Sequence, residues 1–94
     1  MPVLNLTYAE LTQVYTDRFA QLLGNTLIAE VFTPDALAAL ASAMVDTAAE
    51  NVEEYTPYYD YETSLRDNLE VQVIETFDED YADEIIEFMQ FYFD

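Results

Sequence analysis

The sequence from residue 7 to residue 24 reads TYAELTQVYTDRFAQLLG and is typical of an amphipathic helix. Thr7 and Glu10 have the spacing of a capping box, in which each side chain accepts a hydrogen bond from the other residue's backbone amide. Gly24 is the only glycine of the chain and stands where a left-handed helix end is favoured. Apolar residues recur at helical spacing, so we expect a helix over residues 7–23 with one apolar face: Tyr8, Leu11, Val14, Tyr15, Phe19, Leu22 and Leu23.

A second helix signal begins at Thr33. This residue is a good N-cap, Pro34 suits the first helical position, and Asp35 interacts favourably with the helix dipole. We expect a helix that continues to about Tyr55 and is ended by Pro57, because a residue before proline avoids the helical region. Its predicted apolar stripe comprises Leu37, Leu40, Ala41, Met44, Ala48, Val52 and Tyr55, and the acids opposite are Asp46, Glu50, Glu53 and Glu54.

Two segments between these signals are ambiguous. Residues 27–32 form a short apolar run that fits a helical turn or a strand, and we favour the helical turn. Residues 58–61 are expected to be a connection, followed by a helix from Thr63 or Ser64 whose apolar residues recur every four positions. Residues 69–77 also alternate between apolar and polar side chains, which is a strand signal.

The last segment is a clearer helix. Asp78, Glu79 and Asp80 provide a cap and first-turn negative charge before residues 81–93. Its acidic ridge comprises Asp80, Asp83, Glu84, Glu87 and Asp94. Its apolar residues cover more than half of the helix circumference, which predicts central burial or a partner subunit and favours a homodimer.

These elements predict an all-α fold, with residues 1–94 forming a single small domain of four to five amphipathic helices. The alternative is an α+β domain with short strands near residues 27–32 and 69–77. The 94-residue length suits one domain, and 52% hydrophobic residues suffice for a core.

Composition excludes several functions. Lysine and histidine are absent and there are only two arginines, so the chain lacks the cations that bind nucleic acid or anionic membranes directly. Cysteine is absent as well. Because histidine, cysteine and lysine are the usual nucleophiles and neutral-pH bases, we expect no enzyme and no cofactor. The first twenty residues lack the pattern of a signal peptide, and no apolar run is long enough to span a bilayer. We therefore expect a cytoplasmic protein.

Negative charge is concentrated in the second half of the chain. The net charge is −18, and residues 46–94 contain sixteen of the twenty acids, six of the eight tyrosines and only Arg66 as a cation. Like charges three or four residues apart on a helix repel each other, so solubility alone does not account for this density. A compact chain of this length is about 32 Å across, over which duplex DNA carries about nineteen charges. Carboxylates on such a surface can replace phosphates in the basic cleft of a DNA-binding protein.

Three acidic and aromatic segments carry a resemblance to known proteins: Glu53-Glu54-Tyr55, Tyr58-Tyr59-Asp60-Tyr61-Glu62 and residues 77–84, FDEDYADE. In this character the chain resembles the phage-encoded DNA-mimic inhibitors, such as the Ocr-type antirestriction proteins and acidic anti-CRISPR proteins. The resemblance covers the second half of the chain, and the alanine-rich first half departs from it. It implies an often dimeric inhibitor of a restriction or CRISPR enzyme, acting in the cytoplasm of the host cell.

Other functions fit the sequence less well. Adaptation to a salt-rich cytoplasm would spread acids over the whole chain. Residues 78–84 lack the glycine of a calcium-binding EF-hand loop, a di-iron bundle needs histidine, and a carboxylate-pair hydrolase needs a pocket. The runner-up is an acidic adaptor or chaperone-like module that shields a basic protein without imitating DNA.

The sequence thus predicts a non-catalytic DNA-mimic inhibitor with no metal site. Its expected partner is a basic nucleic-acid-binding protein, such as a restriction or CRISPR complex. The candidate partner-binding residues are Asp46, Glu50, Glu53, Glu54, Tyr58, Tyr59, Asp60, Tyr61, Glu62, Asp67, Glu70, Glu75, Asp78, Glu79, Asp80, Asp83, Glu84 and Glu87.

Overall fold

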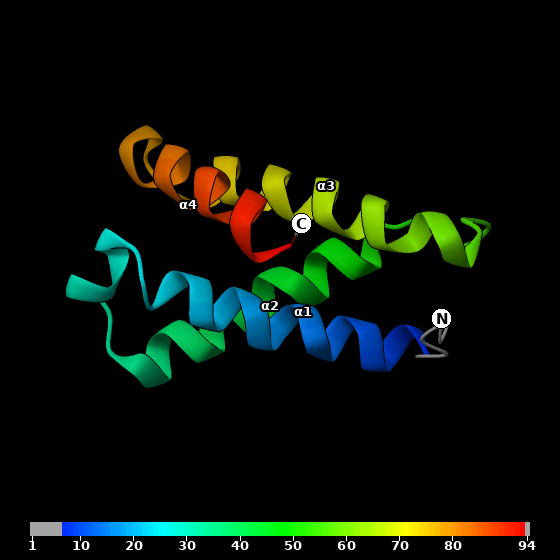
Figure 1. Ribbon diagram of the computed structural model, residues 1–94, viewed down its shortest axis with the longest axis horizontal. Coiled ribbons are helices and arrows are strands. Elements are labelled where there is room, and N and C mark those ends of the chain that lie inside the picture. The colour runs from blue at the N-terminus through cyan, green and yellow to red at the C-terminus, as the bar shows by residue number, and fades with distance from the viewer. Residues whose placement is uncertain (1–6, 94) are drawn as a thin grey trace.

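The computed structural model describes residues 7–93, so Asp94 of the predicted ridge lies outside the described part. This part contains four α-helices, one short 3-10 helix and no strand, which confirms the all-α fold and excludes the α+β alternative within it. The elements are α1 (Tyr8–Leu23), η1 (Leu27–Glu30), α2 (Pro34–Glu50), α3 (Tyr58–Thr76) and α4 (Glu79–Tyr92). Consecutive α-helices run in opposite directions (Figure 1).

The helix α1 begins as the sequence predicts. Thr7 is the N-cap, and both hydrogen bonds of the capping box are formed, with distances of 2.9 and 3.1 Å. The predicted left-handed end is wrong, because Gly24 has φ −66° and ψ −15°. The Gly24 amide bonds to Ala20 O, so the chain continues in a right-handed turn into residues 25–26. The buried residues of α1 are Leu11, Tyr15, Phe19, Leu22 and Leu23.

The apolar run at residues 27–32 is helical at its start. Residues Leu27–Glu30 form η1, and the side chain of Ile28 is buried in the core. The Thr26 hydroxyl donates to Leu23 O at 2.9 Å, which links η1 to the end of α1. This short turn leaves several apolar side chains on the surface.

The helix α2 starts where predicted and ends earlier than predicted. The Thr33 side chain accepts from the Ala36 amide, and Pro34 is the first helical residue. The helix ends at Glu50, whereas the apolar stripe predicted about Tyr55. Continuing it would place Glu53 and Glu54 one turn after Glu50, at the negative end of the helix dipole. Both the like charges and the dipole disfavour that arrangement.

The helix α3 starts at Tyr58, so the prediction that residues 58–61 form a connection is wrong. Pro57 is the N-cap residue, and the rings of Tyr58 and Tyr61 both stack on Tyr8 of α1, with centroids 5.3 and 4.5 Å apart. These contacts hold the first turn of α3 against α1. The predicted four-residue spacing is confirmed, because Leu65, Leu69 and Val73 are fully buried.

The four α-helices enclose one core. Both α1 and α3 pack against α2 and α4, so α2 and α4 occupy diagonal positions in the bundle. Figure 1 shows α3 and α4 as one layer above α1 and α2. On α4, which follows Asp78 as predicted, the buried residues are Ala82, Ile85 and Met89. The molecule measures 38 × 24 × 21 Å.

Candidate functional site

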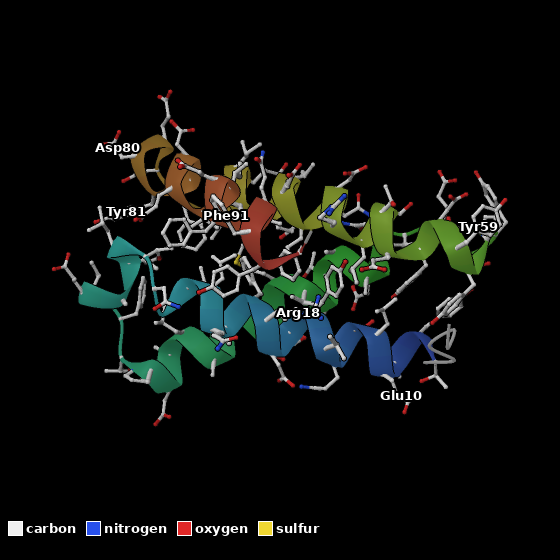
Figure 2. All side chains as sticks on the ribbon, viewed as in Figure 1. Glu10, Arg18, Tyr59, Asp80, Tyr81 and Phe91 are labelled. Carbon is white, nitrogen blue, oxygen red and sulfur yellow. The ribbon has the colours of Figure 1, made fainter. Side chains whose placement is uncertain are left out.

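The acidic residues are concentrated in the layer formed by α3 and α4. Residues 58–93 contain eleven acids and one arginine, a net charge of −10, whereas residues 7–50 have a net charge of −5. Oxygen-tipped side chains line the outer edge of α3 and α4 in Figure 2. The eleven acids of this layer are Asp60, Glu62, Asp67, Glu70, Glu75, Asp78, Glu79, Asp80, Asp83, Glu84 and Glu87.

Fifteen of the eighteen candidate residues have exposed side chains. Glu70 and Glu84 are partly buried, and Tyr61 is buried. The exposed acids and tyrosines are therefore accessible to a partner.

Tyr61 is a correction to the candidate surface. Its side chain is 8% exposed, its ring stacks on Tyr8, and its hydroxyl lies 3.1 Å from Thr12 Oγ1. Tyr61 therefore belongs to the contact between α1 and α3, because its ring packs on Tyr8 and its hydroxyl has a hydrogen-bond partner in Thr12. The Tyr61 side chain is therefore not available to a partner.

The other tyrosines near the start of α3 differ in exposure. Tyr58 is 41% exposed and stacks on Tyr8, whereas Tyr55 and Tyr59 are 80% and 81% exposed. Figure 2 shows Tyr59 at the end of the molecule that includes the start of α3. A hydrogen bond to the Glu53 carboxylate raises the pKa of Tyr55. Two exposed phenol rings, those of Tyr55 and Tyr59, thus lie close in sequence to the start of α3.

Two candidate glutamates accept hydrogen bonds that connect different elements of the fold. Glu62 Oε1 accepts a 2.7 Å hydrogen bond from the Tyr15 hydroxyl of α1, and Glu84 Oε1 accepts a 2.9 Å bond from the Leu27 amide of η1. Each bond joins the acidic layer to the other half of the bundle. These carboxylates have structural roles in the unbound protein.

The candidate residues extend around the bundle. Asp46 and Glu50 lie on α2, Glu53 and Glu54 lie in the following loop, and the rest lie on α3, α4 and the turn between them. Because α2 and α4 are diagonal and α3 packs against both, the set is centred on α3. The surface is therefore convex, and a flat partner could contact only part of it.

The acidic layer also contains a positive charge. The Arg66 guanidinium donates to Phe93 O at 3.3 Å, which ties α3 to the end of α4. Beside it is a hollow of about 250 Å³ lined by Arg66, Asp67, Glu70, Met89 and Gln90. Arg66 thus acts within the layer, and the acids dominate its outer surface.

The described residues contain no cluster of metal ligands, no unpaired fully buried polar side-chain atom and no membrane-spanning helix. Within residues 7–93, no three carboxylates lie close enough together to hold a metal ion. Every fully buried side-chain nitrogen or oxygen in the same range has a hydrogen-bond partner. None of the helices there has the length and apolar character needed to cross a membrane.

Comparisons with protein-family models, curated proteins and solved structures found no match for this chain.

Proposed function

We propose that this protein is a non-catalytic inhibitor that occupies the nucleic-acid-binding site of a basic protein. Its carboxylates take the places of phosphates and accept charge-assisted hydrogen bonds from arginine and lysine side chains of the partner. The main support is the single acidic layer of α3 and α4, with eleven acids against one arginine.

The charge density of this layer is in the range of nucleic acid. At 1.5 Å per residue, the nineteen residues of α3 span about 28 Å, so a net charge of −10 corresponds to one charge per about 2.8 Å. Duplex DNA carries one charge per about 1.7 Å, and a single strand carries one per about 3.4 Å. The charge spacing of the acidic layer lies between these two values and is closer to that of the single strand. The total of −18 exceeds what one face presents, because part of it belongs to α1 and α2.

The convex shape also suits this function. DNA is a convex rod that basic proteins receive in a cleft, and the candidate acids lie on α3, on the two helices that pack against it, α2 and α4, and in the loops next to them. A cleft with cations on both walls would contact more of these acids than a flat surface would. Tyr55 and Tyr59 would add aromatic contact area at one end of such a cleft.

The class of target follows from the resemblance to phage-encoded DNA mimics. We propose a host defence complex of the restriction or CRISPR type, in the cytoplasm of the host cell. The alternative is an acidic adaptor that binds a basic protein outside its nucleic-acid site.

A homodimer is a separate proposal, which rests on the apolar arc of α4. The wide apolar arc of α4 suggested a dimer, and most of that arc is used inside the chain: Ala82, Ile85 and Met89 are buried, and Tyr81, Ile86, Phe88 and Tyr92 pack against the core. Phe91 remains exposed. Sedimentation at micromolar concentration tests the homodimer, and a monomer there would refute it.

The function is tested by a pull-down from bacterial lysate on the immobilised protein, with and without excess duplex DNA. We expect a nucleic-acid enzyme to be retained and to be released by DNA. Partners that DNA does not release would contradict mimicry and support the adaptor.

Two matched variants test the location of the site. Asp67→Asn, Asp83→Asn and Glu87→Gln together neutralise exposed acids of α3 and α4, whereas the control combines Asp17→Asn, Glu30→Gln and Asp35→Asn. Both variants have a net charge of −15, so a non-specific charge effect would weaken binding equally. We expect the first variant to reduce affinity for the retained enzyme at least tenfold more than the control. Equal losses would contradict a site on the acidic layer.

A further inference from the structure

An apolar hollow lies at the end of the bundle where η1 meets the turn between α3 and α4. Its volume is about 240 Å³, and we call it the end hollow. The buried Ile28 of η1 and the partly buried Leu40, Phe77 and Tyr81 form part of its walls. Figure 2 shows Tyr81 on the side of α4 that faces η1. The walls therefore come from elements that the core holds in place.

The rim of the end hollow exposes further apolar surface. Val31 is 65% exposed and Phe32 is 41% exposed, and both line the hollow. Phe32 also lines a second hollow of about 180 Å³, whose other walls include Ala29, Pro34 and Leu37. Leu27, in the first turn of η1, is exposed as well. Contiguous exposed apolar surface next to a concavity is typical of a binding site.

The charges beside the end hollow indicate what kind of molecule fits it. Asp78 is part of the lining, and the exposed Glu79 and Asp80 follow it at the start of α4. An apolar group in the hollow would therefore be held next to carboxylates. A second copy of this chain is disfavoured at this place, because a symmetric contact through the end hollow would bring Asp78, Glu79 and Asp80 of both copies together.

We propose that the end hollow binds an apolar side chain of a partner protein, and that lysine or arginine residues of the partner flank this side chain. The proposal deepens the proposed function and rests on it, because the basic partner of the acidic layer supplies the cations. An empty cavity of about 150 Å³ binds benzene in another protein, so the end hollow has room for one leucine or phenylalanine side chain. Buried apolar anchors in pockets contribute much of the affinity of protein interfaces, whereas exposed charge pairs mainly speed association and set specificity.

The test compares two synthetic peptides of equal charge, acetyl-RRLFKR-amide and acetyl-RRSSKR-amide, in NMR titrations at about 0.15 M salt. We expect the peptide with Leu-Phe to bind about tenfold more tightly, since it alone can bury an apolar side chain. Its largest chemical-shift changes should lie at Ile28, Val31 and Tyr81.

Two variants probe the end hollow without changing the net charge. Val31→Ser removes an exposed part of its wall, and Thr76→Phe places a ring at its edge. Each should lower the affinity of the Leu-Phe peptide to that of the Ser-Ser peptide and leave the latter unchanged. Phe91→Ser is the matched control, because Phe91 is exposed and does not line the hollow. Circular dichroism checks that each variant is folded.

Three results would overturn the proposal: equal affinity for both peptides, a Leu-Phe preference that survives both variants, or no binding of the Leu-Phe peptide. The DNA mimic is tested separately, by release of a retained enzyme with duplex DNA. If the protein is a DNA mimic but its end hollow binds no apolar side chain, duplex DNA would still release the retained enzyme, whereas the Leu-Phe peptide would bind no more tightly than the Ser-Ser peptide.

Discussion

The hydroxyl of the buried Tyr15 of α1 donates a 2.7 Å hydrogen bond to Oε1 of Glu62, an exposed residue of α3. The ring of Tyr15 also stacks on Phe93, with centroids 4.6 Å apart. One side chain of α1 thus contacts both α3 and the residue that caps the end of α4. Replacing Tyr15 with phenylalanine keeps the stacking ring and removes only the hydrogen bond.

We expect Tyr15→Phe to lower the free energy of unfolding by about 1 kcal/mol at pH 7. A hydrogen bond to a charged group contributes more than this, but water can solvate the exposed Glu62 carboxylate after the change. Urea denaturation measures the difference. The control Tyr59→Phe should have no measurable effect, because Tyr59 is almost fully exposed.

The same residue predicts a loss of stability at alkaline pH. Burial, together with the hydrogen bond to Glu62, raises the pKa of Tyr15 above its ordinary value of 10.0. The folded protein therefore holds this proton more tightly than the unfolded chain does. The stabilisation is complete below about pH 10 and decreases as the pH rises above it. Between pH 9 and 11, Tyr15→Phe should lose less stability than the unchanged protein. An equal loss would contradict this assignment.

The sequence predicted the parts of the fold that local interactions determine. The capping box at Thr7 and Glu10, the proline start of α2 and the acidic start of α4 all depend on neighbouring residues. The start of α3 could not be predicted in this way, because it depends on the stacking of Tyr58 and Tyr61 on Tyr8, about fifty residues away. Tertiary contact there outweighed the local signal for a loop.

Long-range contacts within the candidate surface could not be predicted from local sequence patterns either. Composition and helical spacing indicated that most of its acids would be exposed. The partners of Tyr61, Glu62 and Glu84 are 49, 47 and 57 residues away in the chain, so no local pattern could reveal their structural contacts. The end hollow could not be predicted, because the apolar run at residues 27–32 does not reveal which of its side chains the fold leaves exposed, and Val31 and Phe32 are exposed.

Glu84 should stabilise η1 through the Leu27 amide. We expect Glu84→Ala to lower the free energy of unfolding by about 1 kcal/mol, since it removes a charged acceptor from a backbone amide. The Leu27 amide should also exchange with solvent faster, which NMR can measure. Glu87→Ala is the control on the same helix, and its effect should lie within about 0.5 kcal/mol. Equal exchange rates at Leu27 in the two variants would contradict this role.

Two apolar residues of α3 should differ strongly when each is truncated. Leu69 is fully buried, so Leu69→Ala should cost about 2–5 kcal/mol through lost burial and the cavity that it leaves. Ile74 is 61% exposed, so Ile74→Ala should change stability by no more than about 0.5 kcal/mol. Urea midpoints of the two variants provide the measurement. Similar losses would show that the orientation of α3 differs from the one described.

Salt should stabilise this protein. Neighbouring acids of α4, such as Asp80, Asp83 and Glu87, lie three or four residues apart and repel each other by a few tenths of a kcal/mol per pair. The distance over which charges interact falls from about 10 Å at 0.1 M salt to about 3 Å at 1 M, so added salt weakens this repulsion. We expect the melting temperature to rise by about 5–10 °C between 0.02 and 1 M sodium chloride, which corresponds to about 1–2 kcal/mol.

The two triple variants separate this effect from a general response to salt. The variant with Asp67→Asn, Asp83→Asn and Glu87→Gln removes repulsion within the acidic layer, so it should melt higher than the unchanged protein at 0.02 M and gain less from added salt. The control with Asp17→Asn, Glu30→Gln and Asp35→Asn reaches the same net charge but removes a favourable acid from the first turn of α2. It should therefore not melt higher at low salt. A melting temperature that falls with salt, or equal gains in both variants, would contradict repulsion centred on α3 and α4.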